Sequence, residues 1–281
     1  MTNLKSACNI AKLLIGRDTV TIGIAALCNS AREVVIACDR MITATYPPIE
    51  FEHGTPKIDR MSDTCSILSA GDALAHAEIC REVKGRTSAL TRPRVSVITE
   101  QIRLAYVSQR QNTIKQRFLE PRGWTLEDFY GELARRLPLD LFLKVDRDIS
   151  SYNYGLDLIV AGVDPDEAHI YGIRHPGEVD CYDSLGYSAI GIGDLHAVAS
   201  LVSNQYDPSV SRKMATYLVY EAKKNAENAP GVGEYTDIAI ISESSTYIFT
   251  KSDIDSLEQI YNTRRIPQTD EFHSTINNLS F

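Results

Sequence analysis

Near the start of the chain, two runs rich in valine, isoleucine and threonine follow each other closely: Thr19-Val-Thr-Ile-Gly-Ile-Ala-Ala-Leu-Cys28 and Val34-Val-Ile-Ala-Cys-Asp39. The link between them, Asn29-Ser-Ala-Arg-Glu33, is mostly polar and of hairpin length. This pattern predicts two antiparallel strands joined by a turn. Because Val34 to Cys38 is apolar at every position, we expect the second strand to be covered on both of its faces.

The two ends of this predicted hairpin carry a hydroxyl and a carboxylate. Thr19 begins the first strand and Asp39 ends the second, so antiparallel pairing brings both side chains to the same end. If the chain were cut before Thr19, its new α-amine would lie beside its own hydroxyl, which is the arrangement that an N-terminal threonine nucleophile needs. Without a further signal, however, a threonine at the start of a strand is an ordinary β-branched residue.

The composition is that of a folded protein with no nucleic-acid or membrane partner. The 281 residues are 43% hydrophobic, which is enough to build a core in one large domain or two ordinary ones. The formal net charge is −8 and no block of basic residues interleaves with aromatic ones, so we expect no nucleic-acid binding. No apolar run reaches 18 residues, so the sequence predicts no transmembrane helix.

The cysteines and the first residues bear on the compartment. No two of the six cysteines form a C-x-x-C pair, and four lie in or beside apolar runs. This usage favours buried, reduced thiols in a cytoplasmic protein over a set of disulfides. The apolar run Ile10-Ala-Lys-Leu-Leu-Ile15 is too short, and too interrupted by its lysine, for a convincing secretory signal. We interpret residues 1–18 as a leader or propeptide.

Strand and helix signals alternate in groups along the rest of the chain. Thr43 to Pro56 contains three prolines and is predicted to be a loop. Asp72 is a good N-cap for a helix, and Thr125-Leu-Glu-Asp128 has the pattern of a capping box. The predicted strands are 57–58, 64–69, 156–162, 168–173, 179–182, 187–190, 236–242 and 246–250, and the predicted helices are 73–90, 95–118, 125–137, 194–205, 209–226 and 254–261.

This order gives the fold class α+β, in the form of a four-layer αββα sandwich. The links within each group of strands are short, which favours antiparallel pairing. Two sheets packed face to face, each with helices outside, would cover strands that are apolar on both faces. Residues 138–154 show no clear preference, and residues 264–281 are interpreted as a polar tail.

Six short stretches form a recognisable series through their order and spacing. They are Thr19-Val-Thr-Ile-Gly-Ile24, Val35-Ile-Ala-Cys-Asp-Arg40, Pro56-Lys-Ile58, Ser69-Ala-Gly-Asp-Ala73, Leu158-Ile-Val-Ala-Gly-Val-Asp-Pro-Asp166 and Ala189-Ile-Gly-Ile-Gly193. Together they resemble the β-type subunits of proteasomes and their bacterial relatives, which are N-terminal-nucleophile hydrolases with an αββα sandwich. The resemblance implies a domain at 19–250 with a helical insertion at about 110–150, followed by a short helix and polar tail at 251–281.

The resemblance also implies roles for four residues. Thr19 would be the nucleophile and its α-amine the general base. Lys57 would favour the neutral amine and stabilise negative charge on oxygen, and Asp39 would hold Lys57 and the threonine in place. The backbone N–H of Gly71, fourteen positions after Lys57 as in the family, would serve the oxyanion hole.

The chain departs from the family pattern around this site. Asp18 precedes the predicted nucleophile where processed members have glycine, and Ile192 replaces the serine of a Gly-Ser-Gly turn. Met41 stands where the family usually has arginine, and residues 225–234 contain no clear counterpart of the family's aspartate and serine.

The resemblance implies a threonine-type peptidase that hydrolyses polypeptides inside a homo-oligomeric ring in the cytoplasm, with an ATPase regulator left open. Two alternatives remain at this point: an inactive structural subunit of the same fold that keeps its leader, and an amidohydrolase for small amides. No cofactor is expected, because Gly191-Ile-Gly193 lacks the third glycine and the βαβ unit of a dinucleotide site. No metal is expected either, because the six histidines show no ligand spacing among themselves.

Overall fold

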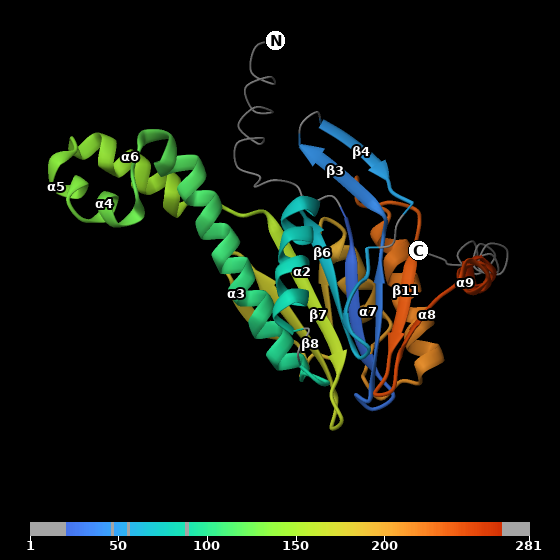
Figure 1. The fold of residues 1–281 in the computed structure, drawn as a ribbon. Helices are drawn as coiled ribbons and strands as arrows, with labels where there is room; N and C mark the ends of the chain where they lie inside the picture. The colour runs from blue at the N-terminus through green and yellow to red at the C-terminus, as the bar shows by residue number, and fades with distance from the viewer. Residues whose placement is uncertain (1–20, 46–47, 55–56, 88–89, 266–281) are drawn as a thin grey trace, which may run out of the picture.

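The computed structural model describes residues 21–45, 48–54, 57–87 and 90–265 (Figure 1). Thr19 and the predicted leader therefore lie outside the described residues, as does the tail after residue 265. The described chain is a mixed α+β protein built on antiparallel sheets, which confirms the coarser part of the predicted fold class. None of its helices is long and apolar enough to cross a lipid bilayer.

The predicted hairpin lies inside the first of two five-stranded sheets. Residues Gly23–Cys28 (β1) and Glu33–Cys38 (β2) pair antiparallel, from Gly23 opposite Cys38 to Cys28 opposite Glu33, and every residue of both strands is buried. This confirms the expectation that β2 is covered on both faces. The strand order is β10-β1-β2-β11-β12, with β10 at Tyr187–Ile190, β11 at Asp237–Ile241 and β12 at Thr246–Ile248.

The second sheet is also antiparallel and has the order β5-β6-β7-β8-β9. Its central strand β7 is buried at every position except Asp157, as expected of a strand between two packed layers. The strands predicted at 64–69, 156–162, 168–173 and 179–182 are confirmed with small shifts at their ends, whereas the strand predicted at 57–58 begins only at Asp59. The five strands are β5 at Asp59–Ser62, β6 at Cys65–Gly71, β7 at Leu156–Val163, β8 at Ala168–Arg174 and β9 at Glu178–Cys181.

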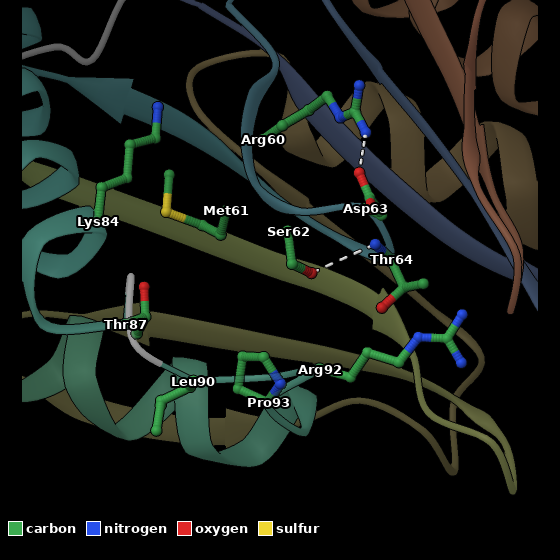
Figure 2. Close-up of a pocket in the computed structure, with 10 residues that line it drawn as sticks. All are labelled: Arg60, Met61, Ser62, Asp63, Thr64, Lys84, Thr87, Leu90, Arg92 and Pro93. Carbon is green, nitrogen blue, oxygen red and sulfur yellow. Dashed lines mark hydrogen bonds and ion pairs between the residues drawn. The ribbon is translucent and has the colours of Figure 1, made fainter.

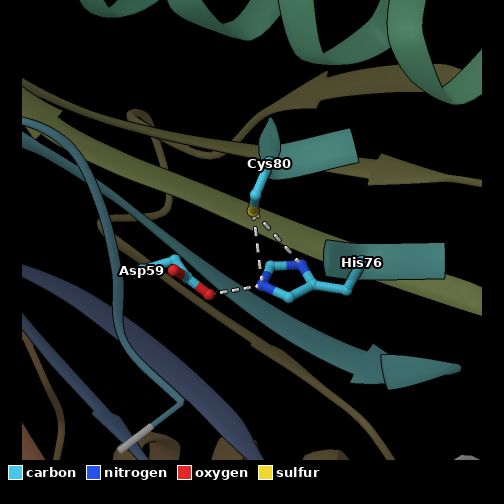
Figure 3. Close-up of side chains that lie close together, drawn as sticks. All are labelled: Asp59, His76 and Cys80. Carbon is cyan, nitrogen blue, oxygen red and sulfur yellow. Dashed lines mark hydrogen bonds and ion pairs between the residues drawn. The ribbon is translucent and has the colours of Figure 1, made fainter. Parts of the chain in front are cut away.

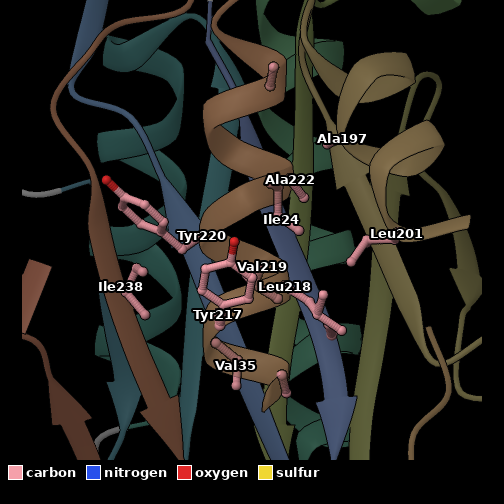
Figure 4. Packing of buried hydrophobic residues seen from close by; sticks show 14 of the residues in the cluster. Ile24, Val35, Ala197, Leu201, Tyr217, Leu218, Val219, Tyr220, Ala222 and Ile238 are labelled. Atoms are coloured by element: carbon pink, nitrogen blue, oxygen red, sulfur yellow. The ribbon is translucent and has the colours of Figure 1, made fainter. Parts of the chain in front are cut away.

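Three apolar clusters show how sheets and helices pack. One cluster joins the two sheets and includes Ile36, Leu68 and Ile159. A second lies between the first sheet and helices α7 (Asp194–Ser203) and α8 (Arg212–Ala226), and Figure 4 shows Leu201 and Val219 among its members. The third lies between the second sheet and helices α2 (Ala73–Thr87) and α3 (Val95–Ile114). Each sheet therefore has two apolar faces. One face packs against the other sheet, and the opposite face packs against helices.

A helical arm extends from the end of α3 and projects beyond the sheets (Figure 1). It has an apolar cluster of its own around Phe129, which stacks on Trp124 and Phe142. The arm contains the π-helical turn η1 (Lys115–Leu119), the 3₁₀ turn η2 (Glu120–Arg122) and helices α4 (Leu126–Tyr130), α5 (Leu133–Arg136) and α6 (Leu139–Ser150).

The structure corrects the predicted helices of this arm. The capping box at Thr125 forms as predicted, but the helix that it opens ends at Tyr130 instead of residue 137. The interruption is at Gly131, which has non-helical backbone angles and where a Cβ would lie 2.7 Å from the carbonyl oxygen of Glu127. Likewise, regular α-helix ends at Ile114, before the predicted limit of residue 118, because the next turn is π-helical. Residues 138–154, for which the sequence shows no clear preference, contain helix α6 (Leu139–Ser150).

The predicted loop from Thr43 to Pro56 is wrong. Met41–Thr45 (β3) and Pro48–Glu52 (β4) form a two-stranded antiparallel hairpin at one end of the sheets (Figure 1). The three prolines suggested a loop, but proline is tolerated as the first residue of a strand, which is where Pro48 lies. The last helix also differs from its prediction, since α9 extends over Lys251–Arg265.

Candidate functional site

Asp39 is the centre of the site. It follows β2 and is fully buried. One carboxylate oxygen, Oδ1, accepts hydrogen bonds from Thr21 Oγ1 and, at 3.1 Å, from Lys57 Nζ. The other, Oδ2, accepts from the backbone N–H of Gly233 at 2.9 Å. A buried charge is costly unless it is paired and hydrogen-bonded, and these three donors meet that requirement. We call Thr21, Asp39 and Lys57 the lysine cluster.

Lys57 is the cation of this cluster. Its Nζ lies 2.7 Å from Thr21 Oγ1 and also donates to the carbonyl oxygen of Met41, so its contacts to hydroxyl, carboxylate and carbonyl use all three ammonium protons. Only 17% of the side chain is exposed. Such a fixed ammonium, held in a partly dry position, stabilises negative charge that develops on a nearby oxygen. Met41 contributes to this site through its backbone carbonyl.

The pairing of β1 with β2 explains why Thr21 meets Asp39. Beyond the last pair of the ladder, the Asp39 N–H still donates to the Ile22 carbonyl at 3.3 Å. In the described residues, the hydroxyl beside Asp39 at this end of the hairpin is that of Thr21. Gly191 lies against the same segment: its φ is +98° and a Cβ there would lie 2.2 Å from the Thr21 carbonyl oxygen. The predicted nucleophile Thr19 lies outside the described residues.

A cavity of about 250 Å³ adjoins Lys57, and Gly71 lies on its wall. Gly71 ends β6 with a φ of +123°, and a Cβ at this position would lie 2.1 Å from the carbonyl oxygen of Gly155. Only glycine fits this backbone conformation and this close approach. The structure thus brings two of the residues singled out in the sequence, Lys57 and Gly71, to one cavity, and joins the first of them to a third, Asp39.

A buried lysine, Lys223, holds the backbone segment that donates to Asp39. Lys223 of α8 is fully buried, and its Nζ donates to the carbonyl oxygens of Gly233 and Glu234 at 2.8 and 2.9 Å. It also pairs with Glu227 at 2.5 Å. Burial lowers the pKa of Lys223, and the hydrogen bond to Glu227 opposes that shift. Lys223 therefore fixes the turn whose Gly233 N–H reaches Asp39.

Arg40 fixes the neighbouring strands at this end of the sheet. Its Nε and Nη2 donate to the Asp237 carboxylate at 3.0 and 2.6 Å, and its Nη1 donates to the Gly54 carbonyl at 3.1 Å. This bidentate pair ties the end of β2 to the start of β11. Neither Arg40–Asp237 nor Lys223 was singled out in the sequence. The signal for Lys223 was its place on the apolar face of α8, beside Val219 and Ala222.

A second cluster of polar groups borders the same cavity (Figure 3). His76 and Cys80 lie one turn apart on α2, both buried, and Asp59 begins β5. His76 Nε2 is 2.8 Å from Asp59 Oδ2 and 3.5 Å from Cys80 Sγ. We call these three residues the histidine cluster. The histidines alone show no ligand spacing, but the spacing of four between His76 and Cys80, one helical turn, is a signal in the sequence that could have indicated this cluster.

Cys80 is not suited to act as a nucleophile in this cluster. Burial raises the pKa of its thiol to about 12, whereas reactive cysteines are thiolates in exposed, electropositive surroundings. The hydrogen bond from His76 lowers the pKa of Asp59. The histidine cluster is thus a hydrogen-bonded carboxylate and imidazole with an adjacent protonated thiol.

Another cavity, of about 540 Å³, lies between the β5–β6 turn and the connection from α2 to α3 (Figure 2). Arg60, Lys84 and Arg92 lie on its wall, together with small polar residues. Two of these cations already have partners, since Arg60 bonds Asp63 at 2.9 Å and Lys84 bonds Asp59 at 3.5 Å. This cavity contains no residue of the lysine cluster, so we do not assign the site to it.

Comparisons with known proteins assign no family to the chain. No protein-family model matches it, and no curated protein is similar to it at a significant level. The functional argument therefore depends on the geometry of the lysine cluster and its cavity.

Proposed function

We propose that the chain is a proteasome-like peptidase subunit of the threonine type, whose nucleophile is freed by cleavage before Thr19. The observation that carries this proposal is the position of Lys57. Its ammonium group contacts a threonine hydroxyl and a buried carboxylate, and it borders a cavity that also contains Gly71. A cation held beside a threonine hydroxyl, with a glycine on the same cavity wall as the cation, provides parts that acyl transfer to threonine uses.

The packing of the layers supports the same proposal. Two antiparallel sheets share one apolar cluster, and each has helices on its other face. This is the arrangement expected for the four-layer αββα sandwich of N-terminal-nucleophile hydrolases. The helical arm is an addition to that arrangement, at the place where the sequence suggested an insertion.

The proposed reaction proceeds through an acyl-enzyme. The Thr19 hydroxyl oxygen attacks the carbonyl carbon of a peptide bond while the Thr19 α-amine takes the hydroxyl proton. Lys57 stabilises the charge on the attacking oxygen, and the Gly71 N–H stabilises the charge on the carbonyl oxygen. The amine returns the proton to the leaving nitrogen, the C–N bond breaks, and water then hydrolyses the ester. Asp39 and Thr21 hold Lys57 in position throughout.

Thr21 is a second candidate for the nucleophile. It is the threonine whose hydroxyl the structure describes between Lys57 and Asp39. Thr19 and Thr21 are two positions apart, which is the spacing of residues that share one face of a strand. We favour Thr19, because the hydroxyl of Thr21 is already engaged with the buried carboxylate. The first residue of the mature chain distinguishes the two.

For substrates and assembly we propose polypeptides that enter a homo-oligomeric ring in the cytoplasm. Enclosure in a ring would admit only unfolded chains, so that a small cavity suffices for hydrolysis. Molar mass in solution, measured by light scattering, tests this part independently. A single-chain mass contradicts the ring and leaves the small-amide hydrolase as the better reading of the site.

The experiment that tests the activity compares four proteins on fluorogenic peptide amides and on small aliphatic amides. Wild type should hydrolyse the peptides, and both Thr19→Ala and Lys57→Ala should lower kcat by at least about 100-fold. Ser69→Ala changes another residue at the cavity and is the matched control, with kcat close to wild type. Equal non-zero rates in wild type and Thr19→Ala would contradict the proposal and favour Thr21, whereas no hydrolysis by wild type would favour the inactive structural subunit.

A further inference from the structure

The histidine cluster contains three side chains with different donor atoms. Asp59 offers a carboxylate oxygen, His76 a ring nitrogen and Cys80 a sulfur, and these atoms all lie within 4.8 Å of one another. They come from β5 and from one face of α2, so a strand and a helix already hold them at this distance. Figure 3 shows all three side chains directed towards a common point.

The distances fit a tetrahedral metal site. With Zn–S of about 2.3 Å and Zn–N of about 2.0 Å, the sulfur and nitrogen ligands of a tetrahedral zinc ion lie about 3.5 Å apart. Cys80 Sγ lies 3.5 Å from His76 Nε2, which matches this value, but it also lies 3.8 Å from Nδ1, so the sulfur must rotate away from Nδ1 to complete the tetrahedron. His76 Nε2 and Asp59 Oδ2, at 2.8 Å, would have to separate by about 0.5 Å to admit the ion. Because 39% of the Asp59 side chain is exposed, there is solvent space for the carboxylate to make this small shift.

We propose that Asp59, His76 and Cys80 bind one Zn²⁺ ion and leave its fourth ligand position open to the cavity. Asp59 and His76 both lie on the wall of that cavity, whereas Cys80 closes the site from the protein interior. Three protein ligands and one open position are the pattern of zinc sites that hold a water molecule or an exchangeable ligand.

The ligand types select the metal. A sulfur and an imidazole nitrogen favour zinc over calcium and magnesium, which prefer oxygen ligands at larger coordination number or with several waters. Binding replaces the thiol proton of Cys80 with the ion and releases that proton to solvent. Lys84, which contacts the other oxygen of Asp59 at 3.5 Å, is placed to hold that carboxylate in orientation, as groups outside the ligand shell commonly do.

The site does not depend on the proposed peptidase activity. Its cavity also contains Lys57, so an ion in the histidine cluster would put a second positive charge beside the same space. An anionic group or a thiolate of a small molecule is the class of ligand that would take the open position. Because zinc binding is measured without any substrate, failure of the peptidase proposal leaves this one testable.

The test uses the full chain, stripped of metal with a chelator and then titrated with zinc or cobalt. We expect one Zn²⁺ per chain by calorimetry and elemental analysis. We also expect a near-ultraviolet thiolate-to-metal band with Co²⁺. Cys80→Ser should abolish this band, and Cys80→Ser and His76→Gln should each weaken zinc binding at least about tenfold. Cys181→Ser, at an exposed cysteine outside the cluster, is the matched control and should bind as wild type.

Three results would overturn the site. These are no zinc retained by wild type at micromolar concentration, cobalt bound without a thiolate band, and equal zinc affinity in wild type and Cys80→Ser. The cobalt spectrum of wild type needs no variant, so it decides the question even if a substitution in the buried cluster prevents folding. Circular dichroism of each variant separates loss of binding from loss of fold.

Discussion

The lysine cluster and the histidine cluster border one cavity but are built differently. In the lysine cluster, the Asp39 carboxylate is fully buried and receives three donors from three separate segments. In the histidine cluster, the Asp59 carboxylate is 39% exposed and pairs with a histidine on the next helix. The first arrangement is stable only when complete, whereas water can replace partners in the second. The difference suggests that one side of the cavity is rigid and the other adjustable.

The largest expected effect separates the two carboxylates. Asp39→Ala removes a buried acceptor and leaves Lys57, Thr21 and the Gly233 N–H without it, so we expect the free energy of unfolding to fall by about 3–5 kcal/mol. Asp59→Ala breaks a partly exposed pair and should cost less than about 1 kcal/mol. Urea denaturation of both variants measures the difference. Equal losses would contradict the contrast between a rigid and an adjustable side.

The second effect concerns the backbone of the cavity wall. Gly71→Ala puts a Cβ 2.1 Å from the Gly155 carbonyl at a φ of +123°, so we expect a loss of about 2–4 kcal/mol and a shift of the adjoining strand. Gly85→Ala on α2 is the matched control, since a Cβ there meets nothing within 4 Å, and it should gain up to about 1 kcal/mol.

Thermal unfolding of the two glycine variants tests this pair. If Gly71→Ala were as stable as wild type, residue 71 would not lie as close to the Gly155 carbonyl as described. The proposed role of the Gly71 N–H at the site would then lose its structural support.

These contrasts follow what the sequence could and could not reveal. The β1–β2 hairpin was predictable because runs of valine and isoleucine joined by a short polar link indicate a hairpin from local sequence alone. The position of Asp39 was predictable because it comes directly after the second strand of that hairpin. Lys57 and Gly71 came from the resemblance and their spacing of fourteen positions. Thr21 was not predicted as a site residue, because the resemblance points to Thr19, at which the β-branched run begins.

The rest of the site depends on contacts between distant segments. Gly233 reaches Asp39 across 194 positions, and Lys223 meets this turn only after α8 has packed on the first sheet. The histidine cluster needs β5 and α2 to meet, although the His76–Cys80 spacing was visible in the sequence. For β3 and β4, the prolines indicated a loop in the local sequence, and the pairing of the two strands is seen only in the structure.

The smallest expected effect is the acid dependence of the histidine cluster. The hydrogen bond from His76 lowers the pKa of Asp59 from its ordinary value of 3.8, so the unfolded chain binds more protons there than the folded chain. This stabilisation is complete above pH 3.8 and is lost as the pH falls through the lower pKa of the folded state. Because the carboxylate is partly exposed, we expect it to amount to less than about 1 kcal/mol.

Urea denaturation of wild type and Asp59→Asn between pH 2 and pH 6 measures this contribution. The stability difference between the two proteins should shrink as the pH falls below 3.8. A difference that stays constant over this range would show that the Asp59–His76 pair contributes nothing to the acid dependence.

The most direct test of the peptidase proposal is the intact mass of the native protein together with its N-terminal sequence. We predict a mature chain that begins at Thr19 and lacks residues 1–18, so that a free amine and a hydroxyl of one residue lie near Lys57. A native chain that retains the residues before Thr19 would contradict the proposal, whatever the stability of the lysine cluster.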